Sequence, residues 1–226
     1  MNLRPRLWLR SFRGGPDPSA QLSLQERDWC ARLPAGVGGR YGASRALLRQ
    51  QLSQHLGCEP LAVPLHSPPG AATLLAPGWG SISLAHSGDR LLIGWSPRPI
   101  GVDLEDGQRR LQAAALAARF FPLQERRQLE ALEPAQLRRA VLESWVHKEA
   151  AIKWSGGSLA ADLRHWCWDH RLRTLLDLRG SAAPLPLRAA SGLVVRRRGG
   201  GAGVGRLGLG SAQPPGPRWR SPFVSL

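Results

Sequence analysis

Apolar residues recur along the chain with the two-residue period of strands in some segments and with helical spacing in others. Alternating apolar positions predict strands over residues 3–12, 82–84, 91–95 and 100–105. Helical spacing predicts helices over residues 44–56, 108–121, 123–132 and 135–154. Residues 158–196 have the character of short strands and loops. The chain therefore mixes both element types, as an α+β protein does.

Local signals mark where several of these helices begin and end. Ser23, with Glu26 three residues later, has the spacing of a capping box and predicts the start of a short helix. Gly57 predicts the end of the helix over 44–56, because glycine readily adopts the left-handed conformation that terminates helices. The sequence Ser155-Gly156-Gly157 predicts the end of the helix over 135–154 in the same way.

The order of the elements suggests a duplicated architecture. A helix followed by a strand hairpin is predicted once in each half, so we expect two similar α+β halves, residues 1–98 and 99–196. Residues 197–226 are rich in glycine, arginine and proline and bury little apolar surface, so we expect a disordered tail.

The composition limits the classes of partner. The formal net charge of +15 predicts an anionic partner: nucleic acid, membrane surface, phosphorylated ligand or acidic protein. No apolar run approaches the ~20 residues that span a bilayer, and residues 1–6 lack the apolar core of a secretory signal. We therefore expect a soluble, cytoplasmic protein. The three cysteines are widely scattered, which argues against a disulfide framework or a zinc site.

The distribution of lysine points to chemistry. Arginine supplies 29 of the 31 basic residues, and the two lysines, Lys148 and Lys153, lie five positions apart. Lysine and arginine are not interchangeable where a compact ammonium group is needed. We interpret the two lysines as functional; the alternative is chance in an arginine-rich composition.

Two carboxylates share one face of the predicted strand over 100–105. Asp103 and Glu105 alternate with apolar residues, so both point away from the apolar face. Carboxylates this close repel each other unless a cation lies between them, and Mg²⁺ prefers such oxygen ligands. The alternative is an ordinary solvated strand end.

A third carboxylate lies on the strongest helix. Helical geometry puts Trp145, Glu149 and Ile152 on one side. Burying a carboxylate beside these apolar groups is costly unless it is paired or holds a metal. The alternative is a surface ion pair between Glu149 and Lys153, which have the favourable spacing of four residues.

The sequence IGVDLED at 100–106, followed about forty residues later by WVHKEAAIKW at 145–154, resembles the paired signature of the 4′-phosphopantetheinyl transferases, especially the surfactin-synthetase-activating type. Residues 118–121 with Glu125 are similar to the segment between the two motifs of that family. The turn His86-Ser87-Gly88 is similar to the family's histidine turn. The resemblance covers about residues 20–165.

The resemblance implies a fold and a reaction. The family fold consists of two similar α+β halves related by a pseudo-twofold axis, with coenzyme A between them and no need of a partner subunit, so we expect a monomer. The reaction moves the 4′-phosphopantetheine group of coenzyme A to a serine of an acyl or peptidyl carrier protein and releases 3′,5′-ADP. Carrier proteins of this kind are usually acidic, which agrees with the charge of +15.

The resemblance also implies a metal site. Asp103, Glu105 and Glu149 are expected to bind Mg²⁺, which also holds the pyrophosphate of coenzyme A. Lys148 is expected to contact the phosphates. Lys153 is expected to donate to the oxygen of the leaving pyrophosphate.

Roles for the remaining residues follow from the same resemblance. Either Glu149, through a metal-bound water, or Glu125 is expected to accept the proton of the serine. His86, Arg45 and Arg40 are expected to bind the 3′-phosphate, a task that suits cationic donors.

Some segments depart from the family pattern. Ser83-Leu84-Ala85 stands where the family commonly has Asn-x-Ser, and 67–69 stands where it has Gly-Lys-Pro. The closing strands of the family cannot be aligned beyond about residue 190. Two other functions stay open: a non-catalytic relative that binds coenzyme A or a carrier protein, and an arginine-rich nucleic-acid-binding protein that uses Arg196-Arg197-Arg198 and the tail.

Overall fold

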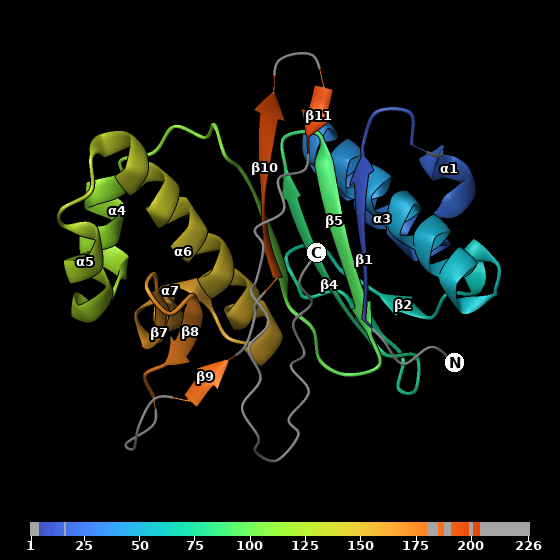
Figure 1. The fold of residues 1–226 in the computed structure, drawn as a ribbon. Helices are drawn as coiled ribbons and strands as arrows, with labels where there is room; N and C mark the ends of the chain where they lie inside the picture. The colour runs from blue at the N-terminus through green and yellow to red at the C-terminus, as the bar shows by residue number, and fades with distance from the viewer. Residues whose placement is uncertain (1–4, 16, 180–184, 188–190, 199–200, 204–226) are drawn as a thin grey trace.

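The computed structural model describes residues 5–15, 17–179, 185–187, 191–198 and 201–203. Two three-stranded sheets lie back to back in the middle of the molecule, and one long helix covers the outer face of each (Figure 1). The fold class is therefore α+β, as the sequence predicts.

The first sheet has the strand order β1-β5-β4, and neighbouring strands within it are antiparallel. One face of this sheet packs against the long helix α3, through a hydrophobic cluster that includes Leu48, Leu52 and Ile93. The elements of this half are β1 (Arg6–Ser11), α1 (Pro18–Gln21), α2 (Leu24–Arg32), α3 (Ala35–Leu56), η1 (Pro60–Ala62), β2 (Leu65–His66), β3 (Leu74–Leu75), β4 (Ser81–Ser87) and β5 (Arg90–Ser96).

The second central sheet has the order β11-β10-β6, and β6 pairs with β10 in parallel. Beside it, β7, β8 and β9 form an antiparallel sheet near the end of α6. The elements of this half are β6 (Val102–Asp106), α4 (Ala113–Phe120), α5 (Leu123–Leu129), α6 (Pro134–Ser155), α7 (Leu159–Asp162), η2 (Leu163–His165), β7 (Trp166–Asp169), β8 (Thr174–Asp177), β9 (Leu185–Leu187), β10 (Ser191–Arg198) and β11 (Gly201–Gly203).

The helix ends agree with the local signals. Ser23 and Glu26 form the reciprocal bonds of a capping box at the start of α2. Gly57 and Gly156 adopt left-handed φ angles of 71° and 69° after α3 and α6. The cap predictions for these three helices are confirmed.

Helix α3 begins at Ala35, nine residues before the predicted start at 44. The added turns are glycine-rich, and glycine has low helix propensity. Gly38 is needed there because a Cβ atom would overlap the carbonyl oxygen of Cys30 on α2. Tertiary packing of α2 against α3 thus outweighs the local propensity.

Helix α4 begins at Ala113, five residues after the predicted start at 108. The intervening residues form a turn, in which Asp106 accepts hydrogen bonds from the backbone N–H groups of Gln108 and Arg109. The backbone N–H groups of Gln108 and Arg109 are therefore engaged with Asp106 rather than with a helix.

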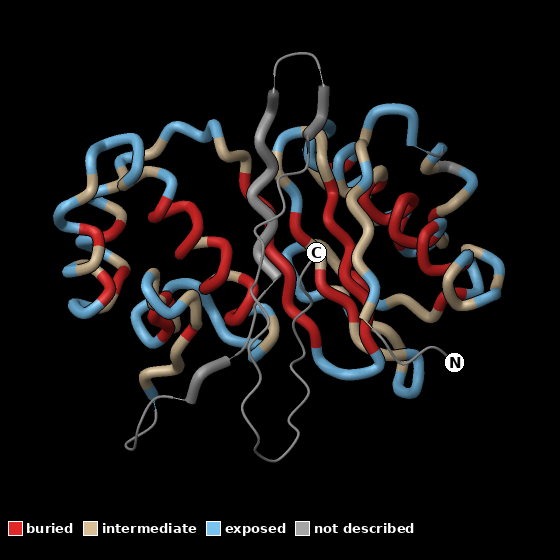
Figure 2. Tube along the Cα trace, viewed as in Figure 1, coloured by how far each residue is buried: buried red, intermediate tan, exposed pale blue. Residues whose placement is uncertain are grey.

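Strand β6 packs on the face of the first sheet that is opposite α3. Val102 and Leu104 contact Ala85 and Leu92 in this layer, and all four are buried. Figure 2 shows buried residues along α3, β4, β5, β6 and α6. The core therefore lies on both sides of the central strands.

The two long helices each comprise 22 residues, and each is followed by an antiparallel hairpin, β4–β5 and β7–β8. The pseudo-twofold relation and the boundary at residues 98 and 99 stay predictions. Strands β10 and β11 reach Gly203, beyond residue 197, where the sequence predicts a disordered tail. Residues 204–226 of that tail lie outside the described residues.

Among the described helices, none combines the length and apolar character that crossing a membrane requires.

Candidate functional site

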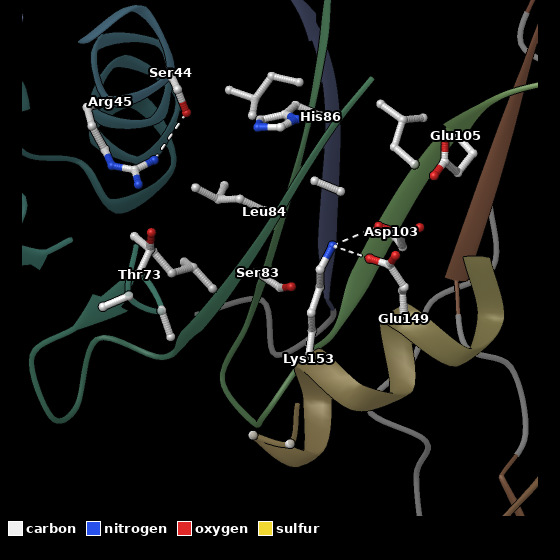
Figure 3. Close-up of a pocket in the computed structure, with 18 residues that line it drawn as sticks. Ser44, Arg45, Thr73, Ser83, Leu84, His86, Asp103, Glu105, Glu149 and Lys153 are labelled. Atoms are coloured by element: carbon white, nitrogen blue, oxygen red, sulfur yellow. Dashed lines mark hydrogen bonds and ion pairs between the residues drawn. The ribbon is translucent and has the colours of Figure 1, made fainter. Parts of the chain in front are cut away.

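A cavity of about 520 Å³ lies between the two halves. Its walls come from α3, the segment between β2 and β3, the strands β4, β5 and β6, and the C-terminal end of α6 with the glycines after it (Figure 3). The sequence-predicted residues among its lining are Arg45, His86, Asp103, Glu105, Glu149 and Lys153.

Three carboxylates converge at one side of the cavity. Asp103 and Glu105 come from β6, and Glu149 comes from α6. One oxygen atom of each lies within 4.8 Å of the others. The approach of α6 to β6 depends on Gly101, because a Cβ atom there would lie 2.6 Å from the backbone nitrogen of Trp154.

Lys153 lies among these carboxylates. Its Nζ is 2.7 Å from Asp103 Oδ1 and 3.7 Å from Glu149 Oε2. Burial raises the pKa of Glu149 to about 7; the charge of Asp103 adds to this rise, and Lys153 opposes it. Burial also raises the pKa of Glu105, while its ion pair with Arg109 acts in the opposite direction. The cluster therefore favours a positive charge between its members.

The acidic cluster fits a magnesium ion. All its donors are carboxylate oxygens, the ligand type that Mg²⁺ prefers. Asp103 is 4% exposed, and its Oδ2 is buried without a hydrogen-bond partner. A cation bound beside such a buried and unpartnered carboxylate oxygen would stabilise its negative charge. Asp103, Glu105 and Glu149 are thus the residues that could hold the ion.

Another side of the cavity carries basic and hydroxyl groups. Arg45 of α3 donates from Nη1 to Ser44 Oγ at 3.1 Å, and its guanidinium lies 4.7 Å from the centre of the Tyr41 ring. The buried Nε of Arg45 has no hydrogen-bond partner. Burial lowers the pKa of Arg45. His86 of β4 also lines the cavity. These groups provide donors for an anion.

Arg40 does not line the cavity. It is exposed, and its Nη2 donates to the carbonyl oxygen of Gly88 at 2.7 Å. Gly88 belongs to the turn that follows His86 and Ser87. The structure therefore connects Arg40 with the turn and does not bring its guanidinium to the cavity.

Lys148 and Glu125 are also absent from the cavity lining. Both are fully buried, and Lys148 Nζ is 2.6 Å from Glu125 Oε2 and 3.8 Å from the centre of the Phe121 ring. Glu125 also accepts a hydrogen bond from the backbone N–H of Trp168 at 3.2 Å. The expected phosphate contact of Lys148 and the expected base role of Glu125 do not agree with this position, because the pair joins α5, α6 and β7 inside the core.

Sequence reasoning missed several polar residues of the cavity. Ser44, Thr73 and Ser83 line it together with the predicted residues. The only sequence signal for Ser44 is its place beside Arg45 on a predicted helix. Thr73 comes from a proline-rich connection whose path no local pattern predicts.

The arrangement suits a ligand with more than one anionic group. Carboxylates with a bound cation can hold one phosphate-like group, and Arg45 with Ser44 and His86 can hold another. The mixed lining also includes apolar side chains of β4, Ile82 and Leu84. A long, polyanionic molecule with neutral parts fits this distribution of charge.

Comparisons with known proteins agree with this chemistry. Residues 99–195 match the model of the 4′-phosphopantetheinyl transferase superfamily. A protein of Synechocystis sp., whose name gives 4′-phosphopantetheinyl transferase as a provisional assignment, is 34% identical over 137 residues. The 4′-phosphopantetheinyl transferase AcpT of Salmonella typhimurium is 34% identical over 132 residues.

These alignments cover 59% and 57% of this chain. The chain spans 56% of the length of the Synechocystis protein and 65% of the length of the Salmonella protein. The part of this chain that carries β6, with Asp103 and Glu105, and α6, with Glu149, is thus similar to the 4′-phosphopantetheinyl transferase superfamily.

Proposed function

We propose that this protein transfers the 4′-phosphopantetheine group of coenzyme A to a serine of an acyl or peptidyl carrier protein. The serine hydroxyl attacks the β-phosphorus of coenzyme A, the bond from that phosphorus to the bridging oxygen breaks, and 3′,5′-ADP leaves. The observation that carries the proposal is one cavity that combines three converging carboxylates with a buried arginine and a histidine.

Asp103, Glu105 and Glu149 would hold the magnesium ion in this proposal. A magnesium ion bound there would neutralise charge on the pyrophosphate. The two carboxylates of β6 are fixed by their strand, and Glu149 is fixed by α6, so the ligands come from two rigid elements. Such preorganisation is what positioning in phosphoryl transfer requires.

Lys153 is the proposed donor to the leaving pyrophosphate oxygen. Its side chain is one-third exposed at the cavity, and its Nζ already lies beside Asp103 and Glu149. Glu149 is the proposed acceptor of the serine proton, through a water on the metal ion it would hold, because its carboxylate lines the cavity. Glu125 is the weaker choice, because it is fully buried with Lys148.

Arg45 and His86 are the proposed ligands of the 3′-phosphate, together with Ser44. The unpartnered Nε of Arg45 supports this role, since it offers a donor from a largely buried guanidinium. Arg40 would act indirectly, through its hydrogen bond to the turn after His86.

The finer parts of the proposal rest on the sequence. The paired motifs favour the surfactin-synthetase-activating type, and the charge of +15 favours an acidic carrier protein. A cavity lined by both halves of one chain supports a monomer. We place the activity in the cytoplasm, where carrier-protein synthesis would supply the substrate.

The test is intact mass spectrometry of an apo acyl carrier protein incubated with this protein, coenzyme A and Mg²⁺. We expect a mass increase of one phosphopantetheine that is lost without metal and strongly reduced in Glu149→Gln. Glu133→Gln is the matched control, because Glu133 is an exposed carboxylate beside the start of the same helix. The control should keep full activity.

Other outcomes separate the remaining functions. If the folded protein binds coenzyme A but modifies none of several acyl and peptidyl carriers, the non-catalytic relative becomes the better proposal. Salt-sensitive binding of nucleic acid that is lost when the predicted tail, residues 197–226, is deleted would instead favour the nucleic-acid-binding protein.

A further inference from the structure

Strands β4 and β6 lie against each other and run in the same direction, although no backbone ladder joins these two described strands. Two serine side chains of β4 provide the connection. The backbone N–H of Val102 donates to Ser83 Oγ at 3.0 Å, and the backbone N–H of Asp106 donates to Ser87 Oγ at 3.1 Å. The two bonds are four residues apart on each strand.

These bonds bracket the acidic pair. Asp103 and Glu105 both lie between Val102 and Asp106, so each end of the segment that carries the two carboxylates is tied to β4. His86 is the neighbour of Ser87 on β4. One strand therefore presents a basic residue to the cavity and holds the segment that carries the acidic ones.

Serine suits this position for a physical reason. A backbone ladder would bring the strands to about 4.8 Å and use up the edge of β4. A hydroxyl oxygen reaches farther and still accepts the N–H bond, so β6 can pack on the sheet while the cavity stays open beside β4. The bond at Ser83 is buried, because Ser83 is 8% exposed and Val102 is fully buried. Removing that hydroxyl would leave a buried N–H group without its acceptor.

We propose that Ser83 and Ser87 are positioning residues, which fix Asp103 and Glu105 relative to the His86 side of the cavity. The inference rests on the proposed function for its consequence in catalysis, but its effect on cation binding does not need that function. Loss of either hydroxyl should let β6 shift and should weaken the binding of a divalent cation at the carboxylates.

The variants separate this role from others. Ser87 does not line the cavity, so Ser87→Ala tests positioning without removing a cavity group. Ser83→Ala tests the buried bond. Ser87→Thr keeps the hydroxyl oxygen as an acceptor. Ser87→Cys has a side chain of similar size, but its sulfur atom is a weak acceptor. Ser81→Ala is the matched control, because Ser81 is on the same strand and does not line the cavity.

The measurement is titration of each purified variant with Mn²⁺, followed by electron paramagnetic resonance of the free ion, with thermal unfolding to confirm folding. We expect the dissociation constant for Mn²⁺ to rise about tenfold in Ser87→Ala and Ser87→Cys, the size of effect that residues supporting metal ligands usually have. Ser87→Thr should restore the wild-type value, and Ser81→Ala should not change it. The KM for coenzyme A should stay within about twofold of wild type in Ser87→Ala and Ser87→Cys, while the kcat of these two variants falls.

Unchanged Mn²⁺ affinity in folded Ser87→Ala and Ser83→Ala would overturn the inference. An equal loss in Ser87→Thr would also overturn it, because the hydroxyl would then not be the cause. Absence of transferase activity in the wild-type protein would overturn the proposed function, and the Mn²⁺ titrations would still decide the role of the serines.

Discussion

The ammonium group of Lys153 lies 2.7 Å from Asp103 Oδ1 and joins α6 to β6 across fifty positions of sequence. Glu149 Oε2 is 3.7 Å from the same Nζ. Lys153 therefore supplies positive charge to the carboxylates that would hold a divalent cation. The same ammonium is the proposed donor to a substrate oxygen.

Lys153→Gln is expected to separate these two effects. Because the ammonium competes with a divalent cation for Asp103, its removal should strengthen Mn²⁺ binding several-fold, as measured by calorimetry. Transfer of phosphopantetheine should fall by roughly 10²-fold, the usual loss when one charge-stabilising donor is removed. Lys153→Arg keeps the charge and serves as the control. Weaker Mn²⁺ binding in Lys153→Gln would contradict the competition.

The buried pair of Lys148 and Glu125 leads to a prediction about stability. Lys148→Met leaves Glu125 buried without its ion-pair partner and should lower the free energy of unfolding by about 3–5 kcal/mol. The double variant Lys148→Met/Glu125→Leu should recover most of this loss, because apolar residues of similar volume can replace a buried pair. Urea denaturation measures both. A higher KM for coenzyme A in Lys148→Met at unchanged stability would instead support a phosphate contact.

His147 makes stability depend on pH. It is buried, its ring lies 3.8 Å from the ring of Trp168, and its Nδ1–H donates to the carbonyl oxygen of Glu143 at 2.7 Å. Burial lowers the pKa of His147 to about 4, from an ordinary value of 6.5. The unfolded chain therefore binds the proton first, and stability is lost as pH falls from about 6.5 towards 4.

The loss attributable to His147 should approach roughly 3 kcal/mol, at ~1.4 kcal/mol for each pKa unit. Urea denaturation at pH values from about 7 down to about 4.5 measures it. His147→Phe keeps an aromatic ring beside Trp168 and should make the dependence less steep; His170, whose pKa burial also lowers to about 4, keeps its own share. His66→Gln is the control, because His66 is exposed. An equally steep loss in His147→Phe would assign the effect to other groups.

Gly101 links the packing of β6 to the geometry of the acidic cluster. A methyl group there would overlap the carbonyl oxygen of Ala150, so Gly101→Ala should push β6 away from α6. We expect a loss of about 1–3 kcal/mol in the free energy of unfolding, as for other overpacked sites, and weaker Mn²⁺ binding. Gly36→Ala is the control, because nothing lies within 4 Å of a Cβ atom at that position. Wild-type Mn²⁺ affinity in Gly101→Ala would show that the cluster tolerates the shift.

Several features could be predicted because their causes are local. Alternation along a strand puts Asp103 and Glu105 on one face. Helical spacing puts Glu149 on the same side of its helix as Trp145 and Ile152, each about one turn away. The capping box at Ser23 and the glycine after each long helix act within a few residues of sequence. The α+β class follows from the same local periods.

Other features could not be predicted because their partners are distant in sequence. Lys148 and Lys153 look equivalent in the motif, but five residues are about 1.4 turns of an α-helix, so the two side chains lie on different faces. Lys148 faces α5 and β7, whereas Lys153 faces the cavity. The parallel pairing of β10 with β6 joins segments about ninety residues apart. Ser83 and Ser87 show no strand-joining signal, since serine occurs in many strands and turns.

Local sequence is enough to show which face of each element a charged residue occupies and where the long helices end, because these features depend on backbone periods and on contacts within a few residues. The meeting of Asp103, Glu105, Glu149 and Lys153 in one cavity with Arg45 and His86, and the exclusion of Lys148 and Glu125 from it, became evident from the folded chain alone. That choice depends on how α3, β4, β6 and α6 pack, and packing is set by the sum of many buried contacts that no local pattern contains.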